Sequence, residues 1–283
     1  MNFNIKKFNI EMLKDRCEID SRKSPMIVII GKKDTGKSFL VRDILYHTQD
    51  AFPIGTVISG TEVANEFFQH MVPSKLIHDK YKPEIVMNMI KRQLSVKTSR
   101  NQDKGRSGGS SSIDPRAFLI LDDCLYDATW IKEESTRYVF MNGRHIDLMT
   151  IITMQYPLGI TPNLRTNVDF VFILRESIVN NRRRIYDNYA GMFPTFDMFC
   201  QFMDQCTENF EGLVICNGVQ SNRLEDQVFW YKASDHPPFK MCDDSLWNDN
   251  KPFSSTMLAS DDYNAESMQK KNKGPWVHVK KTT

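Results

Sequence analysis

The residues best suited to chemistry form a glycine-rich loop with the pattern G-x-x-x-x-G-K-S, made of Gly31, Lys32, Lys33, Asp34, Thr35, Gly36, Lys37 and Ser38. The glycines let the backbone turn its N–H groups onto phosphate oxygens, and a following helix adds partial positive charge. Lys37 supplies a full charge to the β- and γ-phosphates, and Ser38 supplies a hydroxyl to Mg²⁺. The loop therefore predicts a site for a nucleoside triphosphate with Mg²⁺.

A second candidate is a pair of acids that ends an apolar run, Ala117-Phe-Leu-Ile-Leu-Asp122-Asp123. This order is typical of a Walker B strand. We expect Asp122 to hold Mg²⁺ directly or through a water molecule, and Asp123 to polarise the water that attacks the γ-phosphate. An ordinary acidic turn is the alternative, and the glycine-rich loop favours the catalytic interpretation.

A third candidate is Gln155, the first polar residue after the apolar run 148–154, in which only threonines interrupt the hydrophobic residues. In an open α/β sheet, ligands bind beyond the carboxyl ends of the parallel strands. Gln155 is therefore expected to hydrogen-bond the γ-phosphate or the attacking water as a sensor. A purely structural glutamine at the end of the strand remains an open alternative.

The surrounding sequence predicts the elements that position these residues. Residues 26–30 are all apolar, as in a buried strand, and apolar residues recur at helical spacing after Ser38. That order of strand, loop and helix is the context the motif requires, whereas a chance match in a βα turn would not need it. Further strands are predicted at 55–60 and 168–174, and an antiparallel pair at 212–216 and 227–231.

Spacing narrows the class of P-loop protein. The stretch between Ser38 and Asp122 holds a predicted strand and several helices, and an acid directly follows Asp122. Both features resemble RecA-like ATPases. No N-K-x-D tetrapeptide for guanine occurs, which favours ATP over GTP. The expected fold class is therefore α/β: a RecA-like P-loop core, mainly parallel with helices on both faces, plus antiparallel C-terminal strands.

Composition sets broad limits. The chain has 283 residues, 41% of them hydrophobic, and a formal net charge of only +2, so no global basic field indicates a nucleic-acid partner. Six cysteines lie far apart, and six histidines show no H-x₃₋₅-H or H-E-x-x-H pattern, which argues against zinc. No apolar run has the length of a signal segment or a membrane span, so we expect a soluble intracellular protein.

The same pass along the sequence suggests domain limits. We expect an N-terminal extension with a short edge strand at 1–25, a P-loop ATPase domain at 26–242 and a polar, mobile tail at 243–283. Residues 99–115 contain no apolar run and are expected to form a flexible surface loop, a solvated tether or a DNA contact. For the basic run at 181–184, phosphate contact and a solvated helix end remain equally open.

Five motifs in fixed order extend the argument: 30–42 around the glycine-rich loop, 119–123 with the two acids, 142–145 (Asn-Gly-Arg-His), 153–157 (Thr-Met-Gln-Tyr-Pro) and 164–169 (Leu-Arg-Thr-Asn-Val-Asp). Together they resemble the genome-packaging ATPases of large nucleocytoplasmic DNA viruses, within the FtsK–HerA superfamily. The resemblance spans roughly residues 26–240. Two departures are Lys33-Asp34-Thr35, where relatives carry smaller residues, and Asp123, where many ATPases have glutamate.

The resemblance implies a homo-oligomeric ring of five or six subunits that moves double-stranded DNA, with a capsid or portal-vertex protein as partner. It places the protein in the virion and the host-cell cytoplasm. It also implies an arginine finger that reaches a neighbouring subunit's ATP. Arg144 and Arg165 match the two candidate positions, and each has a structural salt bridge as its alternative role.

Two other functions remain open. A cellular-type DNA translocase or helicase of the same fold would need no capsid. A P-loop nucleotide switch or assembly scaffold would bind ATP, turn it over slowly and ignore DNA. Asp123 and Gln155 argue against the switch, because a switch does not need both.

Overall fold

The protein is built around a single eight-stranded sheet in the described residues. The computed structural model describes residues 4–19, 21–105, 113–124 and 129–248. The strand order is β3-β2-β4-β5-β1-β6-β7-β8, and only β6–β7 and β7–β8 are antiparallel pairs. The strands are β1 Met26–Ile30, β2 Ile54–Ser59, β3 Ile77–His78, β4 Ala117–Asp122, β5 Leu148–Met154, β6 Phe170–Ile173, β7 Glu211–Cys216 and β8 Val228–Lys232. The predicted fold class is confirmed, including the antiparallel extension at the C-terminal side.

Two hydrophobic cores lie on opposite faces of the sheet, because successive side chains of a strand point to opposite faces. In β1, Val28 and Ile30 belong to one core, and Ile27 and Ile29 to the other. The first core is covered by α4 Pro83–Gly105, α5 Glu134–Asn142, α6 Pro162–Arg165, α7 Val179–Tyr189 and α8 Phe196–Cys206. The second is covered by α1 Glu11–Arg16, α2 Lys37–His47 and the segment that follows β8.

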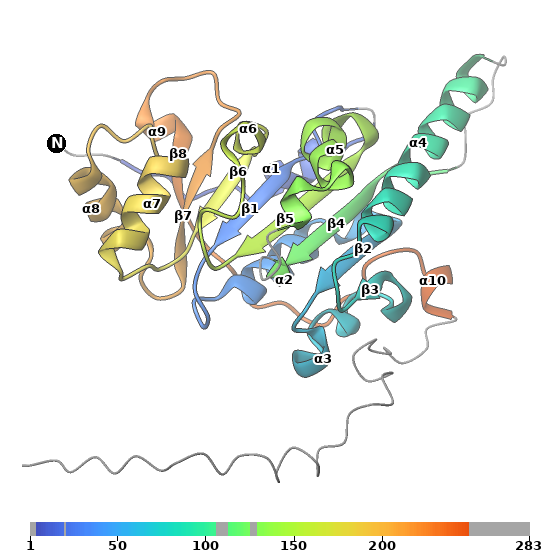
Figure 1. The fold of residues 1–283 in the computed structure, drawn as a ribbon, viewed down its shortest axis with the longest axis horizontal. Coiled ribbons are helices and arrows are strands. Elements are labelled where there is room, and N and C mark those ends of the chain that lie inside the picture. Colours follow the sequence, from blue (N-terminus) through green and yellow to red (C-terminus); the bar gives the residue numbers. More distant parts are fainter. Residues whose placement is uncertain (1–3, 20, 106–112, 125–128, 249–283) are drawn as a thin grey trace, which may run out of the picture. The chain divides into compact units, whose positions relative to one another are not determined.

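Short elements connect these layers. They are α3 Glu62–Asn65, α9 Leu224–Gln227 and α10 Ser245–Asn248, with the 3₁₀ turns η1 Gln49–Ala51, η2 Phe68–His70, η3 Ser74–Leu76, η5 Trp130–Lys132 and η6 Gly143–Ile146. In Figure 1, α7 and α8 lie beside β7 and β8 at one side of the sheet, and β2 and β3 lie at the other. After β8 the chain returns across α2 as a strap, residues 233–243, in which Phe239 and Met241 are buried in the second core.

Sheet order brings the candidate residues to one edge. β4, β5 and β1 are neighbours, with Asp122 opposite Thr153 and Ile30 opposite Met154 in the register. The glycine-rich loop after β1, the acids at the end of β4 and the residue after β5 therefore share the carboxyl edge of the parallel strands (Figure 1).

Three details of the predicted organisation are wrong or lie outside the described residues. Residues 99–105, expected in a loop, continue α4, because lysine, arginine and glutamine are good helix formers even where the apolar face has ended. The remaining loop residues 106–112 are outside the described residues. In place of an N-terminal edge strand, the chain makes one isolated bridge between Lys7 and Trp230 and then forms α1.

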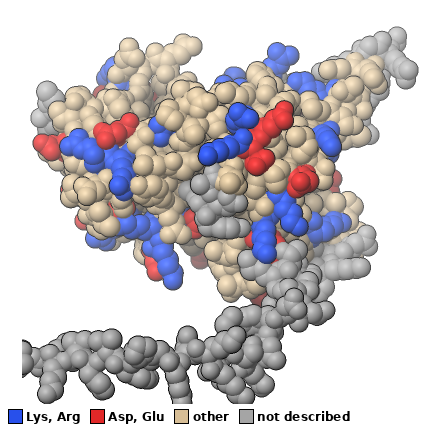
Figure 2. All heavy atoms as spheres, viewed as in Figure 1, with Lys and Arg blue, Asp and Glu red and all other residues tan. Residues whose placement is uncertain are grey.

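The segment 243–248, expected to belong to the tail, carries α10, and the Trp247 indole donates to the Met241 carbonyl at 2.9 Å. Residues 249–283 lie outside the described residues. On the face seen in Figure 2, basic and acidic side chains are interspersed, in keeping with the small net charge. Among the described helices, none combines the length and hydrophobicity that crossing a bilayer requires.

Candidate functional site

The glycine-rich loop is held in a conformation that only its glycines permit at two positions. Gly36 caps α2 at φ 98°, in the left-handed region that side chains disfavour. A Cβ on Gly31 would lie 2.6 Å from the Thr35 hydroxyl, so a larger residue would displace the loop. The Thr35 hydroxyl in turn donates to the Lys32 carbonyl at 2.8 Å. This geometry leaves the backbone free to wrap around an anion at the start of a three-turn helix.

Lys37 lies inside this loop. Its ammonium group donates to the carbonyls of Gly31 at 2.8 Å and Lys32 at 3.1 Å, and its side chain is only 8% exposed. Burial lowers the pKa of Lys37 from its ordinary value, while the nearby carboxylates of Asp123 and Asp122 oppose that shift. The charge is thus partly desolvated and strengthens any interaction with a phosphate.

The first acid of the Walker B pair is locked by hydroxyls. One Asp122 oxygen accepts from the Thr153 hydroxyl at 2.7 Å, and the other accepts from the Ser59 hydroxyl at 2.8 Å. Burial raises the pKa of Asp122, the two hydroxyls lower it, and burial prevails. Asp122 is therefore a rigid, desolvated carboxylate, ready to be compensated by a cation.

The second acid and the sensor candidate are brought together. The Gln155 amide donates to an oxygen of Asp123 at 2.9 Å, and the same oxygen lies 3.9 Å from the Lys37 ammonium. Asp123 has φ 49°, and its own N–H donates to the Thr153 hydroxyl at 3.0 Å. A non-glycine residue held in this region at a cleft marks a place where the fold imposes the conformation. Residues from three strand ends thus converge on one point.

The other loop residues point outward. Lys33, Asp34 and Ser38 are exposed, and Asp34 has φ 62°. The Asp34 side chain is exposed to solvent, yet its charge still acts on Lys37 and opposes the lowering of the Lys37 pKa. Among the described residues, the Ser38 hydroxyl has no hydrogen-bond partner, and it stands in the first turn of α2. Ser38 and Asp122 supply hard oxygen donors of the kind that Mg²⁺ prefers, so the donor set fits this ion.

The side chain of Lys32, a residue predicted to bind nucleotide, forms an ion pair of 2.5 Å with Glu176, which follows β6, and the nucleotide contact of its backbone stays a prediction. Burial opposes ionisation of Glu176, but Lys32, the Ile178 N–H and the Asn181 amide together hold its pKa below the usual value. This acid anchors the glycine-rich loop to the end of β6. Sequence reasoning missed the role, although an acid directly after a strand was available as a signal.

Three further residues of the site were missed. Ser59 at the end of β2 and Thr153 in β5 hold Asp122, and both are fully buried polar residues on strands. Glu62 lies in the same region, where burial raises its pKa, but its two oxygens accept the N–H groups of Phe68 and Gln69 at 2.9 Å. Glu62 is thus engaged in holding η2, which leaves Asp123 as the acid beside Lys37.

Among the described residues, neither arginine candidate contacts Lys37, Asp123 or Gln155, although Arg165 reaches Tyr189, whose hydroxyl lies 3.9 Å from the Met154 sulfur. Arg144 lies in η6 before β5, and Arg165 ends α6 before β6, so both precede their strands. β5 separates the two edges of the sheet by about 20 Å at 3.3 Å per residue. Arg165 donates to the Ile160 carbonyl at 3.2 Å and lies over the Tyr189 ring at 5.4 Å. Arg144 is half-exposed and has no hydrogen bond or ion pair with another described residue.

An apolar cavity of about 450 Å³ adjoins the glycine-rich loop. Its walls include Gly36, Phe39, Leu40, Leu174, Phe210 and Tyr231. Phe210 is 69% exposed and has φ 63°, so the backbone presents this ring at the opening against its usual preference. The polar side chains of Lys232 and Asp235 complete the lining. The sequence analysis did not find this cavity.

Comparison with known proteins places the chain among viral proteins. It is 38% identical over 237 residues to the uncharacterized protein L437 of Acanthamoeba polyphaga mimivirus, covering 83% of this chain and 80% of that one. It is 39% identical over 207 residues to the uncharacterized protein 088R of Invertebrate iridescent virus 3, covering 73% and 75%. The chain belongs to this viral family. Both relatives come from large DNA viruses, as the predicted resemblance expects, and the genome-packaging role stays a prediction. No protein-family model matches the chain.

Solved structures agree on the fold. ATPases 2 and 3 of EssC from Geobacillus thermodenitrificans have a TM-score of 0.52 at 15% identity, covering 81% of this chain and 42% of that one. The pCW3 conjugation coupling protein TcpA, solved with ATPγS, has a TM-score of 0.51 at 16% identity, covering 76% and 61%. B204, the DNA-packaging ATPase from Sulfolobus turreted icosahedral virus, has a TM-score of 0.48 at 13% identity, covering 75% and 100%. The likeness to EssC and TcpA, without that to B204, shows that the chain has the fold of a RecA-like P-loop ATPase.

Proposed function

We propose that this viral protein is an ATP-driven motor that moves double-stranded DNA into a capsid. The observation that carries the proposal is the meeting of Lys37, Asp123 and Gln155, which come from three different strand ends. A protein that only binds nucleotide has no need for an acid and an amide placed together beside the phosphate-binding lysine.

The residues divide the work as follows. The backbone of the glycine-rich loop and Lys37 hold the triphosphate, and Ser38 and Asp122 hold Mg²⁺, which neutralises phosphate charge when it is bound. Asp123 orients the attacking water and accepts hydrogen bonds from it. Gln155, already bonded to Asp123, exchanges that contact for the water or the γ-phosphate and so distinguishes ATP from ADP.

The nucleobase fits the apolar cavity beside Gly36. A flat base stacks on the exposed ring of Phe210 with Phe39 as a second wall, while Asp235 and Lys232 offer polar partners at its edge. The Asp235 carboxylate is an acceptor that an adenine amino group can use. This lining is consistent with ATP as the substrate.

Hydrolysis in this scheme needs a second copy of the chain. Arg144 lies before β5 at the amino edge, and β5 spans about 20 Å at 3.3 Å per residue, so Arg144 is far from the loop of its own chain. Arg144 is the better finger, because Arg165 already contacts Ile160 and Tyr189. A ring of five or six subunits would bring Arg144 to the neighbour's phosphates, where such arginines increase the rate about 10³- to 10⁵-fold.

Tyr156, the residue after Gln155, is the proposed link between ATP hydrolysis and DNA. The Tyr156 ring is exposed, and the Arg184 guanidinium of α7 lies over it at 5.2 Å. Arg184 is exposed in the basic run of 181–184, while Arg182 is engaged with Asp204 at 2.6 Å. A change at Gln155 can thus shift Tyr156 and Arg184 relative to a phosphate backbone. The ATPase domain extends N-terminally beyond the expected 26–242, because Phe8 and Leu13 are buried in its second core. We propose the virion and host cytoplasm as location and a capsid or portal protein as partner.

The test is an ATPase assay of the full-length protein with Mg²⁺, with and without long duplex DNA, alongside the oligomer mass with a non-hydrolysable ATP analogue. We expect a ring, stimulation by duplex DNA and no turnover by Lys37→Ala. Turnover without any response to DNA would favour a switch or scaffold, and strand separation would favour a helicase. A protein that stays monomeric and hydrolyses nothing would rule out the motor.

A further inference from the structure

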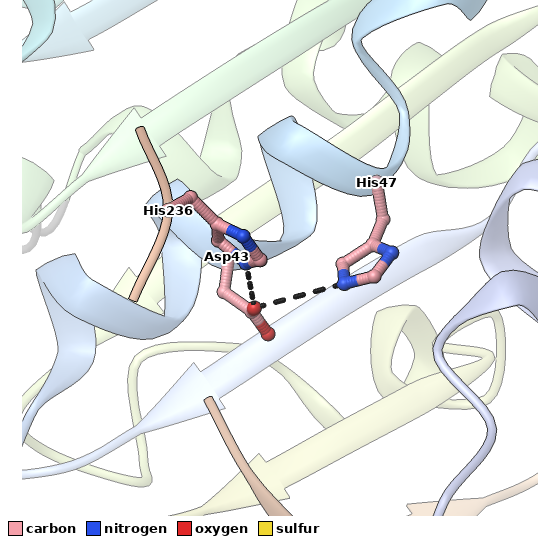
Figure 3. Close-up of side chains that lie close together, drawn as sticks. All are labelled: Asp43, His47 and His236. Carbon is pink, nitrogen blue, oxygen red and sulfur yellow. Dashed lines mark hydrogen bonds and ion pairs between the residues drawn. The ribbon is translucent and has the colours of Figure 1, made fainter. Parts of the chain in front are cut away.

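A second polar cluster lies on α2, at the opposite end from the phosphate-binding lysine. Asp43, His47 and His236 each offer one ligand atom, and these atoms all lie within 4.8 Å of one another. Asp43 and His47 are four residues apart on the helix and share a face, and His236 comes from the strap after β8. Figure 3 shows the two imidazoles on either side of the Asp43 carboxylate.

Hydrogen bonds orient His47 as a metal ligand. Its Nδ1 lies 2.7 Å from an oxygen of Glu11, and a carboxylate can only accept, so Nδ1 carries the proton. The other nitrogen, Nε2, faces Asp43 Oδ1 at 3.8 Å, which is too long for a hydrogen bond. Two ligands of a tetrahedral zinc ion at about 2.0–2.1 Å lie roughly 3.4 Å apart. A carboxylate on the outer nitrogen of a histidine is the usual support for such a ligand.

The other two ligands are also supported. Asp43 is fully buried, its Oδ2 accepts from the Tyr231 hydroxyl at 2.5 Å, and its Oδ1 accepts the Ser234 N–H at 3.2 Å and faces both imidazoles. The His236 ring stacks on Tyr46 at 3.8 Å with an interplanar angle of 10°, and its Nε2 donates to Oδ1 at 2.5 Å, so a metal ion would replace this proton. His236 need move less than 1 Å to reach the ligand separation of zinc.

Charge and access suit a divalent ion. The Asp43 and Glu11 carboxylates together balance two positive charges, and the nearby Arg42 is already paired with Asp235 at 3.4 Å. His47 is 22% exposed, so a water molecule can reach the fourth position. Two imidazoles and one carboxylate favour zinc or cobalt over Mg²⁺, which prefers oxygen ligands.

We propose that Asp43, His47 and His236 bind zinc or a similar divalent transition metal that fastens the strap to the P-loop helix. The metal joins α2 to the segment that lines the cavity next to Gly36 and then crosses the second core. The spacing of histidines along the sequence could not predict this cluster, because His236 comes from a distant part of the chain.

The experiment uses the full-length protein, stripped with a chelator and kept in Mg²⁺ without nucleotide or DNA. Zn²⁺ is titrated by calorimetry, Co²⁺ by visible absorption, and thermal unfolding is followed with and without Zn²⁺. We expect one bound ion per chain, the strong absorption of tetrahedral Co²⁺ without a thiolate charge-transfer band, and a higher unfolding temperature with Zn²⁺.

His47→Gln and His236→Gln should each weaken Zn²⁺ binding at least tenfold and remove the Zn²⁺-dependent rise in unfolding temperature. His145→Gln is the matched control, because His145 is exposed in η6, and it should bind as the unchanged protein does. Equal Zn²⁺ binding by the protein and His47→Gln, or no saturable binding, would show that the cluster is only a hydrogen-bonded clamp. Because no nucleotide is present, this outcome is independent of the ATPase test.

Discussion

The two edges of the parallel sheet differ in how complete they are. At the carboxyl edge, Lys37 and Gln155 both contact Asp123 within one chain, and Asp122 is held by two hydroxyls. At the amino edge, Arg144 is half-exposed and has no hydrogen bond or ion pair with a described residue. At the carboxyl edge no arginine contacts Lys37, Asp122 or Asp123 among the described residues, whereas Arg144 lies at the amino edge with no reacting group beside it. Two copies joined edge to edge would complete a site.

Removing the free arginine is the strongest test of this comparison. Arg144→Ala should lower ATP turnover in the ring about 10³-fold and leave ATP binding unchanged, because the finger acts on the neighbour's γ-phosphate. Steady-state turnover and equilibrium binding of a fluorescent ATP analogue measure the two effects separately.

Mixing variants distinguishes a neighbour's arginine from a structural one. Arg144→Ala chains should regain part of their turnover when mixed with Lys37→Ala chains, which are inactive but carry Arg144. Arg165→Ala is the control and should cost far less, because Arg165 packs on Tyr189 within its own chain. No recovery on mixing, with Arg165→Ala the more damaging change, would assign the finger to Arg165.

A smaller effect is expected within the carboxyl edge, at the cavity beside the loop. Phe210→Ala should raise the KM for ATP about tenfold, because stacking of a base on an aromatic ring contributes about 1–3 kcal/mol. Alanine at position 210 is as strained as phenylalanine in this left-handed backbone conformation. The change in KM therefore reports only the loss of the Phe210 ring. An unchanged KM for ATP would place the base elsewhere.

The smallest effect concerns stability. Asp122→Asn should abolish turnover and still raise the free energy of unfolding near neutral pH by about 0.5–2 kcal/mol, because the fold disfavours the buried charge. Burial raises the pKa of Asp122 in the folded protein above the unfolded value of about 3.9. At pH values below the unfolded pKa, Asp122 is protonated in both the folded and the unfolded protein. There the Asp122→Asn variant has no stability advantage over the natural protein.

As pH rises through the folded pKa of Asp122, the natural protein loses stability that Asp122→Asn keeps. Urea unfolding of both proteins at pH 4 and pH 8 checks the sign. The stability difference should be small at pH 4 and larger at pH 8. A difference that shrinks with rising pH would mean that Asp122 is stabilised as a carboxylate.

Much of the carboxyl edge was predictable from sequence because its residues follow local rules. A glycine-rich loop between strand and helix, acids after an apolar run and Gln155 after another such run each have a fixed place in a parallel sheet. Their meeting follows from strand order alone. Local rules gave a wrong prediction for residues 99–105. These residues lack a hydrophobic face that could pack on the sheet, yet the α4 helix continues through them.

What could not be predicted depends on contacts between distant segments. Ser59 and Thr153 resemble any polar residue on a strand until β2 and β5 are placed on either side of β4. Glu176 gains its role only when Lys32 reaches it across the loop. His236 joins Asp43 because the strap returns over α2, which no spacing rule could show.

The most direct test of the central claim separates binding from hydrolysis at the point where Lys37 and Asp123 meet. ATP affinity and single-turnover hydrolysis are measured for Lys37→Ala and Asp123→Asn in the presence of Mg²⁺ and duplex DNA. We expect Lys37→Ala to bind no ATP, whereas Asp123→Asn should bind ATP as the natural protein does and hydrolyse it at least 100-fold more slowly. Turnover retained by Asp123→Asn would contradict the account.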